Sequence, residues 1–320
     1  MTSGVIAELA WGENRVSSDD MILVLGARQI SPKRVTQLTT QLLKNTGKKV
    51  VWGCLEEDYI AGLENSAQFR TLGAAELKAG LAKVDEAKNQ VQILHYSQIA
   101  APDIIGQGGW SAVIGVNGSW HRAFHYRDEY KQLQKKRIPH KMVSAFVDEA
   151  EAREYERKII NAQPPLSLTQ GQEADEEQFF QVVEEVSRRS FDHTWQTGAA
   201  LAKNGKFLLA AHNRVVPFET FALLRGASKE KHLTPPQDLN HFDTNHAEVE
   251  LLIEAGKQKI DLEGCSLYIN LMPCPICARM LTRTGIKEVV YHNEHSRGYA
   301  QTILNRSNVT VKQVAIQNYH

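Results

Sequence analysis

The sequence predicts an α/β protein made of two domains joined by a linker. In the first 160 residues, short apolar runs alternate with stretches of helical pattern, which is typical of a parallel sheet with helices on its faces. Residues 161–175, "NAQPPLSLTQGQEAD", hold two prolines among mostly polar neighbours and indicate a linker. Strands and helices resume after it, and a length of 320 residues suits two domains.

The elements of the first domain follow from its apolar runs. "MILVLG" (21–26) predicts a strand, and a helix should begin after it, with Ser31 as N-cap and Pro32 in the first helical position. Further strands are expected at "KKVVWGCL", "NQVQILHY", "SAVIGVNG" and "HKMVSAFV", and helices at "RDEYKQLQKK" and "DEAEAREYERKII". Residues 1–20 are expected to be a poorly ordered lead-in. We therefore predict a Rossmann-like α/β domain of unknown role over residues 1–160.

The second domain, residues 176–320, should open with a helix whose first residues are acidic, "DEEQFFQVVEEVSRRSF". The pair Asn204-Gly205 between two apolar runs predicts a hairpin. A long polar insertion follows it. The expected order after the insertion is a helix (245–257), the strand "SLYINLM", a helix (274–284) closed by Gly285, the strand "IKEVVYHN", a helix and a last strand, "VTVKQV".

Composition excludes several classes of protein. Lys+Arg and Asp+Glu both number 37, so the formal net charge is zero. Sequence-independent nucleic-acid binding depends on a basic surface, which this balance does not indicate, although a local basic patch is not excluded. No apolar run approaches the ~20 residues of a membrane helix, and the first residues lack a secretory pattern. Four cysteines, two of them in one Cys-x-x-Cys, do not make a disulfide framework. We expect a soluble cytoplasmic protein without membrane contact.

A metal site is predicted by "NHAEVELLIEAG" (245–256) together with "LMPCPICARM" (271–280). Zn²⁺ takes thiolate and imidazole ligands, usually four, and His246, Cys274 and Cys277 are the natural three. Both cysteines lie at a helix start, where the helix dipole favours thiolate over thiol. A redox pair or a structural half-site is the alternative reading of the two cysteines.

The fourth ligand decides whether this zinc is structural or catalytic. Cys265 precedes Cys274 across an apparent strand that separates them by about 25–30 Å, and Cys54 belongs to the other domain. Three histidines could still close the site: His241, His292 and His295. The simpler count is three protein ligands and a position open to water, which marks a catalytic zinc.

Glu248 is the candidate catalytic residue. A carboxylate beside a zinc-bound water can take its proton and deliver it elsewhere. The alternative is a first-turn glutamate that only complements the helix dipole. The complete set, His-x-Glu followed by Pro-Cys-x-x-Cys, favours the catalytic role because it is the signature of zinc deaminases.

With these motifs the sequence resembles the cytidine/deoxycytidylate deaminase superfamily, whose elements match in order from about residue 175 to 316. "PCPIC" followed by a helix and "GIKEVVY", and the long insertion between Asn213 and His246, are closest to its deoxycytidylate deaminase branch. The resemblance implies a cytidine-deaminase-like α/β/α sandwich. It also implies zinc on His246, Cys274 and Cys277, with Glu248 as the proton shuttle.

The resemblance further implies the substrate contacts. Asn213 would hydrogen-bond the sugar, although a turn residue at the end of a strand is the alternative. The backbone of Ala247 would contact the pyrimidine edge, and the backbone at Met272 and Pro273 would accept from the leaving amino group. Met272 replaces the Ser or Glu that the family often has there, with little consequence expected for a backbone contact. Related deaminases assemble as oligomers, so a homo-oligomer is expected by resemblance only.

The predicted function is therefore zinc-dependent hydrolytic deamination of a small cytosine-containing nucleotide or nucleoside, dCMP-like, by attack of water at C4 with release of ammonia. One alternative is a nucleic-acid deaminase acting on tRNA adenosine or single-stranded cytosine. Another is a binding or scaffold protein whose fold is stabilised by zinc and which catalyses no reaction.

The first domain offers only weak motifs. "VLGARQISPKR" combines a strand, a glycine and a helix start, as anion sites do, but lacks GxGxxG or GxxxxGK[ST] spacing. "SWHRAFHYRDEYKQLQKKR" reads as a solvated helix face or as a contact to nucleic acid or phosphate. The domain could equally be an oligomerisation or regulatory scaffold.

Overall fold

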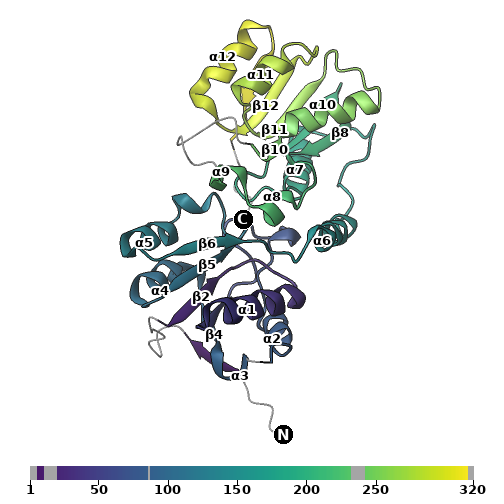
Figure 1. Ribbon diagram of the computed structural model, residues 1–320. Coiled ribbons are helices and arrows are strands. Elements are labelled where there is room, and N and C mark those ends of the chain that lie inside the picture. Colours follow the sequence, from purple (N-terminus) through teal and green to yellow (C-terminus); the bar gives the residue numbers. More distant parts are fainter. Residues whose placement is uncertain (1–5, 11–19, 86, 232–241, 316–320) are drawn as a thin grey trace. The chain divides into compact units, whose positions relative to one another are not determined.

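The computed structural model describes residues 6–10, 20–85, 87–231 and 242–315. The chain forms two compact units (Figure 1). The first unit comprises Met1–Ile159 and Thr220–Asp243, and the second comprises Ile160–Glu219 and Thr244–His320. Among the described residues, no helix combines the length and the apolar character needed to cross a membrane.

The first unit is built on a six-stranded sheet in which all neighbouring strands are parallel. Its strands, in spatial order, are β1 (Ala7–Ala10), β4 (Val91–Tyr96), β3 (Lys49–Leu55), β2 (Met21–Leu25), β5 (Ala112–Val116) and β6 (His140–Val143). The five apolar runs of the sequence form β2 to β6, as predicted. The lead-in prediction is wrong for β1, which pairs with β4 at the sheet edge through backbone hydrogen bonds that need no apolar run.

Helices cover both faces of this sheet. The helices in this part of the chain are α1 (Pro32–Thr46), α2 (Ala74–Leu81), α3 (Ala87–Gln90), α4 (Ala101–Gln107), α5 (Asp128–Lys136) and α6 (Glu149–Asn161). Alternate residues of β2 point to opposite faces, and Leu23 and Leu25 pack in a core with Ile104 of α4 and Leu133 of α5. On the other face, Trp52 of β3 donates its indole N–H to Thr39 Oγ1 of α1 at 2.9 Å.

The first long helix begins as the sequence predicts. The Ser31 side chain accepts a hydrogen bond from the backbone N–H of Arg34 at 3.1 Å, and Pro32 is the first helical residue. The helix ends at Gly47, which adopts a left-handed φ of 65° that glycine takes at no steric cost. Local cap chemistry therefore fixes both ends of α1.

The second unit contains a five-stranded mixed sheet. In spatial order its strands are β13 (Thr310–Gln313), β12 (Glu288–Asn293), β11 (Ser266–Leu271), β7 (Gly198–Lys203) and β8 (Lys206–His212). The first three are mutually parallel, and β7 runs antiparallel to both of its neighbours. Asn204 and Gly205 join β7 to β8 with φ of 53° and 74°, as a two-residue turn with both residues at positive φ requires. The predicted hairpin is confirmed.

Helices lie on both faces of this sheet as well: α7 (Glu176–Ser187), α10 (Ala247–Lys257), α11 (Pro275–Leu281) and α12 (Tyr299–Arg306). Ala200 and Ala202 of β7 pack against Phe179 of α7 in one core. Their neighbours Ala199 and Leu201 pack in the other core, whose helical residues come from α10, α11 and α12. The unit is thus a three-layered α/β/α arrangement. Because side chains alternate along each strand, it has one hydrophobic core on each face of the sheet.

The long insertion of the second domain is shared between the units. It opens with β9 (Arg214–Val215), which pairs antiparallel with β10 (Thr244–Asn245) just before His246. Between them, α8 (Phe221–Arg225) and α9 (Ser228–Lys231) belong to the first unit. The carbonyl of Leu223 accepts from Asn117 Nδ2 at 3.3 Å. The sequence predicted the whole insertion to lie in the C-terminal domain, but the described helices α8 and α9 belong to the first unit.

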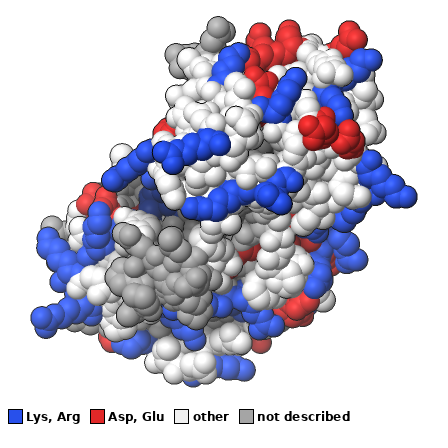
Figure 2. Space-filling view, turned by 90° about the horizontal axis from the view of Figure 1, so that it is seen from above, with Lys and Arg blue, Asp and Glu red and all other residues white. Residues whose placement is uncertain are grey.

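Charged side chains of both signs appear on the face seen in Figure 2, where Lys and Arg gather in several places and Asp and Glu form separate groups. The zero net charge is therefore an average over a surface with local basic areas.

Candidate metal centre

Three ligand atoms converge in the second unit. The metal-binding atoms of His246, Cys274 and Cys277 all lie within 4.8 Å of one another. His246 Nδ1 is 3.6 Å from Cys274 Sγ and 3.4 Å from Cys277 Sγ. Around tetrahedral zinc, with Zn–S near 2.3 Å and Zn–N near 2.0 Å, a nitrogen and a sulfur ligand lie about 3.5 Å apart. The three side chains therefore fit one zinc ion.

The backbone places these ligands at two helix starts. His246 is the N-cap of α10 and follows β10 directly. Cys274 is the N-cap of α11, three residues after the end of β11, and Pro275 is the first helical residue. One turn further on, the backbone N–H of Cys277 donates to Cys274 Sγ at 3.4 Å. The Cys-x-x-Cys spacing thus brings both sulfurs to the same end of one helix.

The local environment favours thiolate at Cys274. The two thiols share a hydrogen bond, which together with the neighbouring His246 lowers the pKa of Cys274 and, with burial, raises the pKa of Cys277. Thiolate is the form that binds zinc, so this environment prepares a metal ligand.

Glu248 lies in the first turn of α10 and is only 3% exposed. Burial raises the pKa of this carboxyl group, which also interacts electrostatically with His246 and Cys274. A glutamate that only complemented the helix dipole would gain most by remaining solvated, since burial penalises its charge. The position of Glu248, buried beside the three ligands, favours a role in proton transfer.

Among the described residues, no fourth side chain joins this group. Cys265 Sγ donates to the carbonyl of Asp261 at 3.4 Å, and the His292 ring stacks on Phe180 with 3.6 Å between ring centroids. His295 precedes a short 3₁₀ turn (Ser296–Gly298) and Cys54 is buried in the first unit. His241 lies outside the described residues. Within the described part of the chain, a zinc ion held by His246, Cys274 and Cys277 would keep one position for water.

Asn213 is buried and takes part in several hydrogen bonds. Its Oδ1 accepts from the backbone N–H of Thr197 at 2.8 Å, and its Nδ2 donates to the carbonyl of Trp195 at 2.8 Å and to Asp192 Oδ2 at 3.3 Å. Its backbone carbonyl accepts from Ser190 Oγ at 2.9 Å. Asn213 therefore holds the loop between α7 and β7 in place, and only the second lone pair of Oδ1 is left for a further donor.

The loop residues that bind Asn213 were missed in the sequence, where "FDHTW" matches no motif. The other predicted substrate residues lie close in sequence to the zinc ligands. Three of these residues are buried: Ala247, Met272 and Pro273. Their side chains are apolar, so only their backbone groups could hydrogen-bond a substrate. The backbone N–H of Met272 is already used by the carbonyl of Asn293 at 2.8 Å.

The comparisons with known proteins agree with this chemistry. Residues 173–293 match the family model described as the cytidine and deoxycytidylate deaminase zinc-binding region. An uncharacterised deaminase of Aliivibrio fischeri is 34% identical over 111 residues, which are 35% of this chain and 67% of that protein. Human deoxycytidylate deaminase is 28% identical over 147 residues, covering 43% of this chain and 78% of its own length.

Solved structures include the apo dCMP deaminase of cyanophage S-TIM5, which is 26% identical, covers 43% of this chain and 95% of its own, and has a TM-score of 0.35. The alignments to these relatives span less than half of this chain. The matched family region is a zinc-binding region, and it contains the group of His246, Cys274 and Cys277 that can hold a metal ion. Zinc is therefore the cofactor. The chain therefore belongs to the cytidine and deoxycytidylate deaminase family, as a zinc-dependent hydrolytic deaminase.

Proposed function

We propose that this protein hydrolyses the exocyclic amino group of a cytosine-containing nucleotide or nucleoside, dCMP-like, and releases ammonia. The observation that carries the proposal is the convergence of the His246 imidazole and the sulfurs of Cys274 and Cys277, with the buried carboxyl of Glu248 beside them. Similarity to deoxycytidylate deaminases supports cytosine as the base. In this proposal His246, Cys274 and Cys277 hold the zinc.

A zinc ion held there supplies Lewis acidity, which makes water nucleophilic near neutral pH. Glu248 takes the proton of the attacking water and delivers it to N3 of the cytosine ring, so that C4 accepts the new C–O bond. The same carboxylate then takes the proton of the new C4 hydroxyl and passes it to the exocyclic amine, so that ammonia leaves as the C–N bond breaks and C4 becomes a carbonyl. Burial raises the pKa of Glu248 above its ordinary value, which makes its carboxylate a stronger base toward the proton of the water.

The substrate would be oriented by neighbouring backbone and by one side chain. We propose that the free acceptor position of Asn213 Oδ1 takes a sugar hydroxyl and that the Ala247 backbone contacts the pyrimidine edge. The leaving amine would donate to the backbone at Met272 and Pro273, directly before Cys274. The sugar would have to reach the Asn213 side chain beside the three hydrogen bonds that this side chain already makes.

The test compares ammonia release from dCMP, cytidine and cytosine by the purified zinc-loaded chain and by Glu248→Gln. General acid–base roles contribute roughly 10²–10⁴-fold, so kcat should fall by about that factor while zinc content stays the same. Glu254→Gln is the matched control, because Glu254 lies on the same helix and pairs with Lys257 at the surface at 2.7 Å. Full activity in Glu248→Gln would refute the mechanism.

The same assay separates the alternative functions. Ammonia release from tRNA or single-stranded DNA, without turnover of dCMP or cytidine, would favour a nucleic-acid deaminase. Bound zinc with no turnover of any of these substrates would favour the scaffold reading.

We further propose that the first unit is Rossmann-like. Its parallel strands β4, β3, β2, β5 and β6 follow the order 3-2-1-4-5 when they are numbered along the chain. That order begins the doubly wound Rossmann arrangement, with helices on both faces. An experimental structure with a different strand order would overturn this assignment.

A further inference from the structure

The α7–β7 loop, residues 188–197, is fastened beside the segments that carry the zinc ligands. At its C-terminal end, Asn270 Oδ1 accepts from the backbone N–H of Gly198 at 3.0 Å, and Asn270 Nδ2 donates to the carbonyl of Gln196 at 3.0 Å. Asn270 lies near the end of β11, shortly before Cys274. This end of the loop therefore lies beside the strand that leads to the two cysteine ligands.

The middle of the α7–β7 loop is held by Asn213, which adjoins the third ligand. β9 and β10 pair antiparallel, and their last register pair is Arg214 with Asn245. The next residues, Asn213 and His246, therefore lie next to each other at the end of this ladder. In turn, Asn213 Nδ2 donates to Asp192 Oδ2 in the loop at 3.3 Å. The contacts thus lead away from the zinc site through Asn213 to Asp192.

His193 follows Asp192 in this loop and is only 6% exposed. Among the described residues, neither its ring nitrogens nor its backbone N–H has a hydrogen-bond partner. The next two backbone N–H groups, by contrast, are used: those of Thr194 and Trp195 donate to Asp192 Oδ1 at 2.7 and 3.3 Å. A polar group that is buried without a partner lowers stability. The position of His193 in the loop therefore indicates that it binds a ligand.

A phosphate group fits this position best. Imidazole and backbone N–H groups donate hydrogen bonds, and the oxygens of an ionised phosphate accept them. Both carboxylate oxygens of Asp192 already accept from N–H groups, which offsets the nearest negative charge. In a nucleotide the sugar lies between the base and the phosphate. That order matches the path from the zinc site past Asn213, the proposed sugar contact, to His193.

We propose that His193 binds the 5′-phosphate of the substrate and so selects a nucleotide over the corresponding nucleoside. The ring N–H and the backbone N–H of His193 donate to phosphate oxygens. The inference rests on the proposed deaminase function, because it takes the base to be at the zinc and the sugar at Asn213. His193 has no part in the proton transfers of Glu248, so it determines specificity and not the chemical step.

The test measures ammonia release from dCMP and from deoxycytidine by the full zinc-loaded chain and its variants. The wild type should have a kcat/KM for dCMP at least tenfold above that for deoxycytidine, as expected for a hydrogen bond to a charged group. His193→Phe keeps an aromatic ring but removes both ring nitrogens. It should lower kcat/KM for dCMP at least tenfold, mainly through KM, and change deoxycytidine less than twofold. His193→Gln keeps a donor and should recover part of this loss.

His95→Phe is the matched control, because it replaces a histidine of the first unit that pairs with Glu8 at 2.9 Å. It should leave the preference for dCMP unchanged. Equal losses for both substrates in His193→Phe would show that His193 only packs the loop. That result, or a wild type without preference for dCMP, would overturn the proposal. His193→Leu, which also removes both nitrogens, carries the same test if His193→Phe does not fold.

Binding of the products separates this proposal from the proposed function. If neither substrate releases ammonia, the deaminase function fails, and calorimetric titration with dUMP and deoxyuridine tests His193 without turnover. The wild type should bind dUMP at least tenfold more tightly than deoxyuridine, and His193→Phe should remove this difference. Equal affinities of the two products in the wild type, or a difference that persists in His193→Phe, would overturn the phosphate contact.

Discussion

Replacing Asn213 by alanine separates its structural role from contact with the substrate. The change removes three side-chain hydrogen bonds from a residue that is 4% exposed. The buried N–H of Thr197 loses its acceptor, which costs about 1–3 kcal/mol. The carbonyl of Trp195 and the carboxylate of Asp192 border a more exposed loop and can regain water, so together they add roughly 1 kcal/mol.

The expected loss of unfolding free energy is therefore about 2–4 kcal/mol. For a unit of this size, 1 kcal/mol corresponds to roughly 4 °C in Tm, so Asn213→Ala should melt about 8–16 °C lower. Circular dichroism melting of the zinc-loaded protein measures it. Asn293→Ala is the matched control, because that exposed amide makes one hydrogen bond, to the carbonyl of Asn270 at 3.1 Å, and its loss should shift Tm by less than 4 °C. An unchanged Tm in Asn213→Ala, with KM raised tenfold or more, would show that the loop contacts contribute nothing and that Asn213 serves only the substrate.

Two further predictions concern the cores. Thr39→Val deprives the buried indole N–H of Trp52 of its acceptor and should cost about 1–3 kcal/mol in urea unfolding, whereas a loss below 0.5 kcal/mol would contradict this hydrogen bond. Burial lowers the pKa of His292 against the opposing charge of Glu176. The folded state thus binds fewer protons than the unfolded state, and stability present above pH 6.5 is lost as pH falls toward the folded pKa. Urea unfolding at pH 7.5 and 5.5 should show this loss in the wild type and a smaller one in His292→Gln, and equal losses would refute it.

Local signals in the sequence predicted much of the fold. Ser31 with Pro32, and Asn204 with Gly205, determine backbone geometry within a few residues, so the cap of α1 and the β7–β8 turn could be read directly. β1 could not, because "AELA" has no run of β-branched or aromatic residues and is held by pairing with β4.

The division of the insertion between the units was also beyond the sequence. Nothing in "ETFALLRGASKEK" shows that the carbonyl of Leu223 will accept from Asn117. Which unit an apolar segment packs on depends on contacts between residues more than a hundred positions apart.

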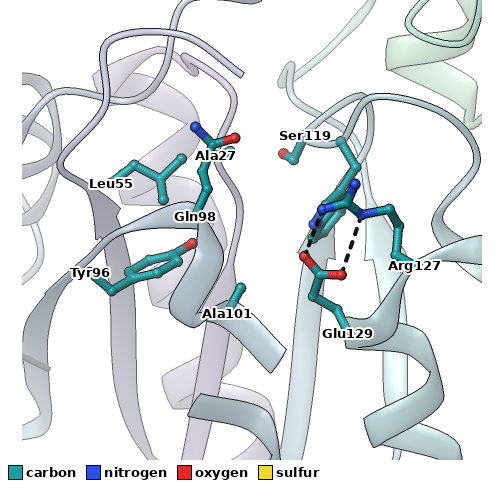
Figure 3. A pocket seen from close by; sticks show the side chains of 9 residues that line it. Ala27, Leu55, Tyr96, Gln98, Ala101, Ser119, Arg127 and Glu129 are labelled. Carbon is teal, nitrogen blue, oxygen red and sulfur yellow. Dashed lines mark hydrogen bonds and ion pairs between the residues drawn. The ribbon is translucent and has the colours of Figure 1, made fainter. Parts of the chain in front are cut away.

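The zinc ligands could be predicted because their spacing at helix starts is itself the requirement of the chemistry. The hydrogen bonds of Asn213 could not, since they come from a loop that carries no motif. A small pocket of the first unit (Figure 3) was missed for a similar reason. Its polar residues, among them Tyr96 and Glu129, come from separate strand ends and helices and meet only when the sheet forms.

The most direct test of the central claim is one experiment on the purified chain: zinc stoichiometry together with ammonia release from dCMP, before and after removal of the metal by a chelator. The account predicts one zinc per chain, loss of turnover with the metal, and recovery of turnover when zinc is restored. Turnover that persists in metal-free protein, or a full complement of zinc with no ammonia release from any cytosine substrate, would contradict it.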